Sequence, residues 1–207
     1  MSLPEICGFS VAPALEHLDL VPPAVAEVLV EWAQAEPSVK SDVGLIEIDP
    51  ADSDTAALVE KFGLNWDLAA NCVLVAGRRA GLERIAAVLV RADTKADVNG
   101  TVRRLLDARK ASFMPADQAV AASGMEYGGI TPVGVPDDWR ILIDSGVITR
   151  GDALIGAGVR GAKLVAPGEL FATLPRAEVI DGLALTTSTG NPPTGPVTLD
   201  EVAVRLV

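Results

Sequence analysis

The chain has few of the side chains that usually hold metals or act as nucleophiles. Its 207 residues include two cysteines, Cys7 and Cys72, and a single histidine, His17. These three lie far apart in the sequence, whereas a structural zinc site needs four clustered ligands. A Ser-His-Asp or Cys-His arrangement would have to use His17, which lies in an amphipathic N-terminal segment. We therefore expect no metal, no cofactor and no catalytic triad.

Long apolar runs and a basic N-terminal lead are absent as well. No apolar run approaches the roughly 20 residues that cross a bilayer, and Glu5 lies where a signal peptide would be basic. Apolar residues nevertheless make up 49% of the chain, while aromatic residues make up 4%. This composition predicts a globular α/β or α+β protein, located in the cytoplasm and without a membrane partner.

Positive charge is scarce overall but concentrated in one region. The net charge is −11, and residues 1–77 contain only Lys40 and Lys61 as cations, whereas residues 78–110 contain nine. This basic island (residues 78–110) can bind phosphates locally, because exposed charges are screened beyond about 10 Å at moderate salt. A solvated surface with paired charges is the alternative, and the composition leaves both open. The candidate phosphate contacts are Arg78, Arg79, Arg103, Arg104 and Lys110.

The spacing of apolar residues predicts many short strands and a few helices. The expected helices are 24–32 behind Pro23, 56–62 between a cap at Asp54 or Thr55 and Gly63, 98–106 after Asp97, 116–120 and 167–174. The expected strands are 43–48, 71–76, 85–90, 112–114, 140–144, 152–156, 162–165 and 177–180. This pattern predicts a mixed, curved, barrel-like sheet with helices around it.

Residues 124–134 form a loop that is unusually rich in glycine. Four glycines, Thr131 and Pro132 share eleven positions. Gly128 and Gly129 can adopt backbone angles that are closed to other residues, and they allow a ligand to approach the main chain. Pro132 fixes its own φ and favours an extended Thr131, so we expect a rigid loop. Its successive amides can attract an oxyanion or a carbonyl oxygen, although an ordinary connection between two elements remains possible.

Several pieces of the chain occur in the order that is typical of a known family. They are Asp54–Gly63, the strand beginning at Asn71, the helix after Asp97, Ala111–Met114, the glycine loop, Ile143–Asp144, the turn 156–158 and Asp181. Residues 41–182 thereby resemble the YbaK/prolyl-tRNA synthetase-associated domain family of trans-acting aminoacyl-tRNA editing domains. The glycine loop is the specific element of this resemblance. It implies an editing domain at 41–182, a helical N-terminal extension at 1–40 and a partly flexible C-terminal tail at 183–207.

The resemblance implies an aminoacyl-tRNA deacylase, which hydrolyses the ester between a wrong amino acid and the 3′ end of tRNA. The loop amides would hold the acyl ester, and a bound water or a substrate group would attack it. The partner would be the tRNA acceptor end with its aminoacyl-adenosine, and a synthetase or a second copy of the chain is a further possible partner. The implied catalytic residues are Gly128, Gly129, Thr131 and Asn71. The implied substrate-binding residues are Ile130, Pro132, Gly156, Gly158 and Lys163, and the basic island adds Arg103 and Arg104 as substrate contacts.

The chain also departs from the family pattern at three positions. Asn71 occupies the place of a family lysine, no tyrosine is present near Leu45–Glu47, and Lys163 replaces an acidic residue. Lys163 is either a relocated phosphate anchor or a surface lysine at a strand edge. The alternative function is therefore a catalytically altered member that binds a tRNA end, a nucleotide or a protein without deacylation. For a shared site, the glycine loop must lie beside the start of the strand at Asn71.

Overall fold

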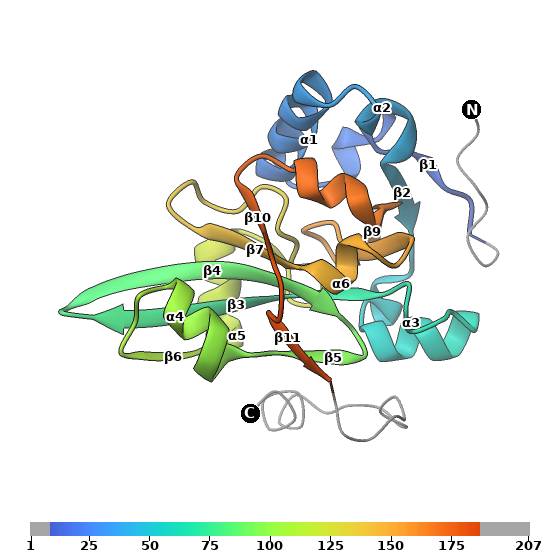
Figure 1. Ribbon diagram of the computed structural model, residues 1–207. Coiled ribbons are helices and arrows are strands. Elements are labelled where there is room, and N and C mark those ends of the chain that lie inside the picture. The colour runs from blue at the N-terminus through green and yellow to red at the C-terminus, as the bar shows by residue number, and fades with distance from the viewer. Residues whose placement is uncertain (1–8, 187–207) are drawn as a thin grey trace.

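The computed structural model describes residues 9–186, which form two main β-sheets with helices around them (Figure 1). The first sheet has the order β1 (Ala12–Pro13), β2 (Gly44–Glu47), β9 (Ala162–Pro167) and β8 (Asp152–Gly156). The second has the order β10 (Ala177–Ile180), β7 (Arg140–Asp144), β4 (Leu82–Arg91), β3 (Ala70–Arg79) and β6 (Lys110–Phe113). A short pair joins β11 (Ala184–Thr186) to β5 (Thr94–Ala96).

The predicted mixed α/β class is therefore correct, whereas the barrel-like detail is not confirmed. Each of the two main sheets ends at an edge strand on both sides, and no closed barrel forms among residues 9–186. The five-stranded sheet is mixed, because β4 pairs antiparallel with β3 and parallel with β7. Strand β7 is apolar and buried over Ile141–Ile143, as expected for a parallel strand that is covered on both faces.

Strands β3 and β4 form a hairpin that is longer than the sequence pattern predicts. The sequence pattern predicts strands at 71–76 and 85–90, separated by residues 77–84. In the structure the pairing continues to Arg79 and Leu82, and only Ala80 and Gly81 form the turn. Both turn residues have positive φ, at 52° and 80°, which matches the right-handed twist of a two-residue hairpin connection. The basic residues at the tip therefore extend the strands.

Most helices agree with local sequence signals. The helices are α1 (Pro23–Ala35), α2 (Val39–Asp42), α3 (Thr55–Phe62), α4 (Arg103–Leu105), α5 (Ala116–Ser123) and α6 (Ser145–Ile148), with 3₁₀ turns at Ala14–Glu16, Leu18–Leu20, η3 (Pro50–Asp52) and η5 (Gly168–Thr173). Helix α3 begins as predicted, because the Asp54 carboxylate accepts hydrogen bonds from Ala56 and Ala57, and Gly63 ends it with φ of 60°.

The helix predicted over 98–106 is irregular in the structure. Residues Val98–Val102 form a π-helical turn, η4, which continues into the short helix α4. The carboxylate of Asp97 accepts hydrogen bonds from the amides of Gly100 and Thr101 at 3.0 and 2.7 Å. These bonds satisfy two amides of the first turn, and they lower the pKa of Asp97 against the opposing effect of its partial burial.

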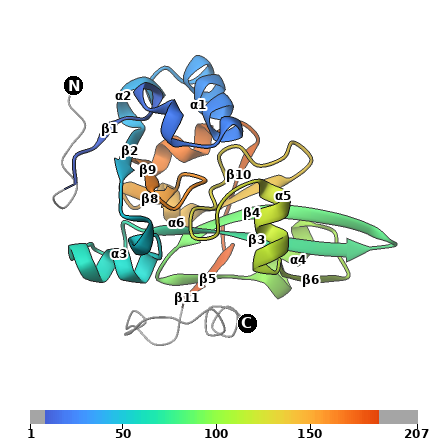
Figure 2. The same cartoon turned by 180° about the vertical axis from the view of Figure 1, so that it is seen from behind.

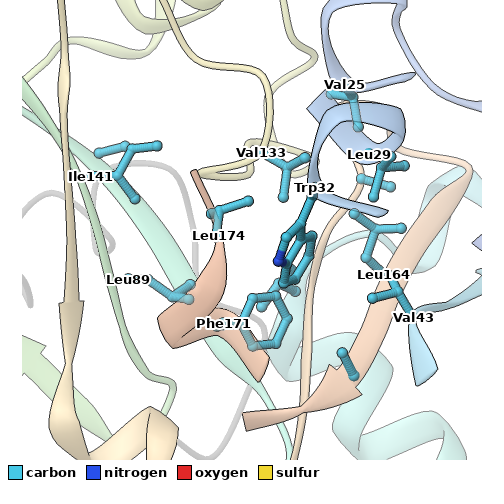
Figure 3. Packing of buried hydrophobic residues seen from close by; sticks show 14 of the residues in the cluster. Val25, Leu29, Trp32, Val43, Leu89, Val133, Ile141, Leu164, Phe171 and Leu174 are labelled. Carbon is cyan, nitrogen blue, oxygen red and sulfur yellow. The ribbon is translucent and has the colours of Figure 1, made fainter. Parts of the chain in front are cut away.

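Helix α1 packs into the same hydrophobic cluster as both main sheets. Val25, Leu29 and Trp32 are fully buried there, beside Phe171 of η5 and Val133 of the glycine loop (Figure 3). The indole of Trp32 donates to the hydroxyl of Thr173 at 2.8 Å. The predicted helical extension thus shares a core with the strands, while the domain boundaries stay a prediction.

Two further predictions concern the C-terminal tail and the absence of a membrane-spanning helix. The predicted tail falls largely on residues 187–207, which lie outside the described part of the chain. Within residues 9–186, no helix is both long enough and apolar enough to cross a bilayer.

Candidate active site at the glycine loop

The glycine loop runs from α5 to β7 and packs against the turn between β8 and β9. The amide of Glu126 donates to the carbonyl oxygen of Gly158 at 2.9 Å, and the amide of Gly158 donates to that of Gly129 at 2.7 Å. Inside the loop, the amide of Gly129 donates to Glu126 at 3.0 Å. The loop is therefore fixed by main-chain hydrogen bonds, as its composition predicts.

Three of the predicted site glycines have a packing role in this arrangement. A Cβ on Gly129 would overlap the carbonyl of Val159, and a Cβ on Gly156 would overlap the carbonyl of Gly129. Gly158 has a φ of +86°, and a side chain there would press on Pro22 just before α1. The two turns can approach this closely only because these positions are glycine. Their contact with a substrate stays a prediction.

Several amides of the loop have no hydrogen-bond partner. Within residues 9–186, the amides of Gly128, Ile130 and Thr131 donate to no other residue. Thr131 is fully buried, and Pro132 after it is buried as well. Unpartnered buried amides are rare in folded proteins, and of the three residues only Thr131 is buried, whereas Gly128 and Ile130 are half-buried. Successive free amides in such a loop can bind a carbonyl oxygen or an oxyanion.

Lys163 lies beneath this loop and is buried. Its side chain extends from β9, with 5% of the residue exposed. The ammonium donates to the carbonyl oxygens of Ser53 at 2.8 Å and of Gly128 at 3.1 Å. Burial lowers the pKa of Lys163 from 10.5 to about 8; the charge of Asp54 opposes this shift and that of Arg160 adds to it. The alternative of a surface lysine at a strand edge is therefore wrong.

Asn71 lies at the start of β3, next to the N-terminus of α3. Its side-chain oxygen accepts a hydrogen bond from the hydroxyl of Thr55 at 2.7 Å. Ser53, two residues earlier, is bridged to Gly128 by the ammonium of Lys163. Segment 53–55 therefore binds Asn71 through Thr55 and is linked to Gly128 through Ser53 and Lys163. The structure thus brings the glycine loop close to Asn71. This juxtaposition is what a shared site requires.

Ser53 and Arg160 belong to the site although the sequence analysis did not select them. The hydroxyl of Ser53 is buried and has no hydrogen-bond partner among the described residues. The guanidinium of Arg160 donates to the carbonyl oxygen of Pro50 from Nε and Nη2, at 3.1 and 2.8 Å, and to that of Tyr127 from Nη1 at 3.1 Å. Its amide donates to the carboxylate of Glu126 at 2.6 Å. Arg160 thus joins η3, the glycine loop and the β8–β9 turn.

Residues 49–174 match the aminoacyl-tRNA editing domain family. The chain belongs to this family. No curated protein matches its sequence.

Two solved structures share the fold of this editing domain at low sequence identity. The crystal structure of a hypothetical protein, APE2540, has a TM-score of 0.64 at 19% identity and covers 76% of this chain and 99% of its own. That of a candidate trans-editing enzyme for prolyl tRNA synthetase has a TM-score of 0.61 at 16% identity and covers 78% of this chain and 97% of its own.

The hairpin-tip arginines of the basic island of this editing domain lie away from the glycine loop. Arg78 pairs with Glu83 at 2.8 Å, and Arg79 pairs with Asp107, so the charges at the hairpin tip are largely compensated. Arg78 is seven residues along β3 from Asn71, which is roughly 23 Å in a strand. The hairpin points away from α3 in both views (Figures 1 and 2).

Arg103 and Arg104, the two predicted substrate contacts of the island, are exposed on α4. The α4 region is tied to the outer half of the hairpin, because Arg84 donates to the carbonyl oxygens of Leu106 and Asp107 at 3.0 and 2.8 Å. These two arginines therefore do not join the residues around Gly128. Their phosphate contact stays a prediction for a more distant part of a nucleic acid.

Proposed function

We propose that the protein is an aminoacyl-tRNA deacylase that hydrolyses the ester of a mischarged tRNA in the cytoplasm. The observation that supports this most directly is the set of unpartnered amides at Gly128, Ile130 and Thr131, in a fixed loop beside Asn71. Membership of the editing family supplies the substrate class. Amides aimed at a developing negative charge stabilise it without metal or nucleophilic side chain.

In this mechanism the ester carbonyl oxygen binds to the amides of the glycine loop. A water molecule, which a hydroxyl of the substrate can orient, adds to the carbonyl carbon and generates a tetrahedral oxyanion. The bond from that carbon to the ribose oxygen then breaks, and the proton lost by the attacking oxygen is transferred to the leaving ribose oxygen. The protein contributes orientation and charge stabilisation, with Ile130, Thr131 and Pro132 forming the wall beside the acyl group.

Asn71 and Lys163 have different roles in this proposal. Asn71 offers a neutral amide donor whose orientation is fixed by Thr55. Lys163 is occupied by two carbonyl oxygens beneath the loop, which favours a role in holding the Gly128 peptide in place. A role of Lys163 as a relocated phosphate anchor requires its remaining N–H group to reach that phosphate.

The second candidate function is binding of a tRNA end without deacylation, alone or together with a synthetase or a second copy of the chain. The observation that favours it is Asn71, which cannot supply the positive charge of the family lysine. The neutral amide would suit recognition of the acceptor end as well as catalysis.

A panel of mischarged tRNAs, incubated with the purified protein, separates the two functions. Deacylation of one or a few members, faster than their spontaneous hydrolysis, supports the enzyme. Binding of the same tRNAs with spontaneous rates of hydrolysis supports the binding function. The absence of both would refute the proposal.

A further inference from the structure

Tyr127 is unusual among the aromatic residues of the chain. The sequence contains four Phe, three Trp and one Tyr, and all eight lie within residues 9–186. Seven of them are buried or half-buried, and Tyr127 alone is exposed, at 38%. A chain with so few aromatic residues places its single exposed one directly before Gly128. This placement needs an explanation, because the core does not use the ring.

The main chain around Tyr127 is held in place while the ring is partly free. Its carbonyl oxygen accepts a hydrogen bond from Arg160 Nη1, and the next residue, Gly128, is bonded to Lys163. Partial burial and, secondly, the charge of Asp54 raise the pKa of Tyr127. The same Asp54 acts on Lys163. Through Gly128 and Lys163, this part of the loop is linked to Ser53, and Thr55 of the same segment binds Asn71.

We propose that the ring of Tyr127 stacks on the purine base of the 3′-terminal nucleotide. This inference rests on the proposed function, since the acceptor end carries the ester on a terminal adenosine. Exposed aromatic rings bind unpaired bases by stacking, which contributes about 1–3 kcal/mol per base. The arginines of the hairpin tip and of α4 lie away from the glycine loop, so a stacking contact supplies affinity closer to the ester. The fixed main chain lowers the entropy lost on binding.

The other exposed apolar side chains do not share this position. Leu82 lies at the hairpin tip, Val30 on α1, Val179 on β10 and Leu185 on β11. None of them belongs to the glycine loop or to segment 53–55. Leu82 is therefore a suitable control, because its replacement removes exposed apolar surface elsewhere.

The first test uses a short single-stranded RNA that ends in CCA, with 2-aminopurine in place of the terminal adenine. Stacking quenches the fluorescence of this base. We expect the wild type and Tyr127→Phe to quench it on binding, whereas Tyr127→Ala binds about tenfold more weakly without quenching. Leu82→Ala should behave as the wild type. Absence of quenching by the wild type, or full quenching by Tyr127→Ala, would overturn the inference whether or not the protein hydrolyses esters.

The second test separates this inference from the proposed function. Two esters of the same amino acid are compared, one with adenosine and one with ethanol. Tyr127→Ala should lose about tenfold in kcat/KM on the adenosine ester, mainly through KM, and nothing on the ethyl ester. An equal loss on both esters means that Tyr127 only supports the loop, which contradicts stacking. If the wild type hydrolyses neither ester, the proposed deacylase function is refuted but the stacking inference is not. The fluorescence test then decides whether Tyr127 stacks on the terminal base.

Discussion

Lys163 is the residue whose environment differs most from what its type suggests. A lysine is rarely buried, because removal of its charge from water costs several kcal/mol unless partners compensate. Here two carbonyl oxygens and the nearby Asp54 supply part of that compensation. The pKa of about 8 shows that burial outweighs them. The arrangement stabilises the position of the loop at a cost to the stability of the whole fold.

This cost predicts a characteristic pH dependence of stability. The pKa of folded Lys163 is lower than in the unfolded chain, so the folded state binds fewer protons between pH 8 and 10.5. Stability contributed by this residue therefore rises with pH in that range. Relative to Lys163→Met, the unfolding free energy of the wild type should increase by about 2 kcal/mol between pH 8 and 10, measured by urea unfolding.

Lys61→Met provides the control for that measurement. A hydrogen bond from Lys61 to Asp52 raises the pKa of this exposed lysine. The stability that Lys61 contributes is present below its pKa in the unfolded chain and is lost as the pH rises through its higher pKa in the folded state. This pH dependence is opposite in direction to that of Lys163. A wild-type and Lys163→Met pair with parallel pH curves would contradict the burial of the charge.

Gly128 allows a test of the acyl-binding loop at the level of one atom. A Cβ on Gly128 would lie 2.9 Å from the Ser53 hydroxyl and 3.2 Å from Arg160 Nη1, and its φ is +88°. We expect Gly128→Ala to fold with a loss of about 1–2 kcal/mol from the strained φ. Its kcat/KM for deacylation should fall by about 100-fold, the range for loss of an oxyanion donor.

The matched control for this variant is Gly151→Ala. Gly151 has the same φ of +88°, but a Cβ there would meet nothing within 4 Å. Both variants should therefore lose similar stability, measured by thermal unfolding, while only Gly128→Ala loses turnover. If Gly128→Ala keeps the wild-type rate, the loop serves as a connector and the amides do not hold the ester.

Local signals explain which elements could be predicted from the sequence. Helix α3 was correct at both ends because Asp54 and Gly63 act on their own turns. The glycine loop was found because its composition restricts the backbone directly. The strand order was not accessible, because the pairing of β2 with β9 depends on contacts more than 100 residues apart.

The same argument separates the site residues that were found from those that were missed. Asn71 and Gly128 were selected by resemblance to a family pattern. Ser53 and Arg160 carry no local signal, since their roles arise from main-chain carbonyls of distant segments. The burial of Lys163 was equally hidden, because β9 reads as an ordinary apolar strand with one cation.

Helix α1 supports the glycine loop although it precedes the region that matches the family. Gly134 of the loop and Gly158 of the opposite turn both lie against the start of α1, near Val25. Val25→Ala should therefore cost about 2 kcal/mol of stability through the cavity that it leaves, and it should also lower deacylation. Val30→Ala on the exposed side of the same helix should change neither by much. Chemical unfolding and a deacylation assay check both variants, and equal effects would contradict a supporting role of this helix face.

At the scale of the whole molecule, the acyl site and the basic residues of the hairpin tip and α4 occupy different regions. The site lies where the glycine loop meets α3 and the start of β3, whereas Arg78 and Arg79 lie at the other end of the hairpin (Figure 2). Arg91 of the island, which pairs opposite Ala70, is at the near end. The sequence could show that the charges cluster but not where, since Arg78, Arg79 and Arg84 are paired with acids only in the fold. A tRNA that occupies the acyl site must therefore reach the island with a part remote from its ester.

This separation predicts that the salt dependence of tRNA affinity arises mainly from Arg103 and Arg104. Both are exposed on α4, and each phosphate contact contributes about −0.7 to −0.9 to the slope of log affinity against log salt. Replacement of both by Gln should flatten the slope for tRNA binding by about 1.5 without a change in the turnover of an aminoacyl-adenosine. Arg78→Gln should have little effect, because Glu83 already neutralises that charge. Binding titrations between low and physiological salt measure the slopes. Binding that ignores salt would exclude the tRNA contact at α4, and a loss of turnover on aminoacyl-adenosine would place these arginines at the acyl site instead.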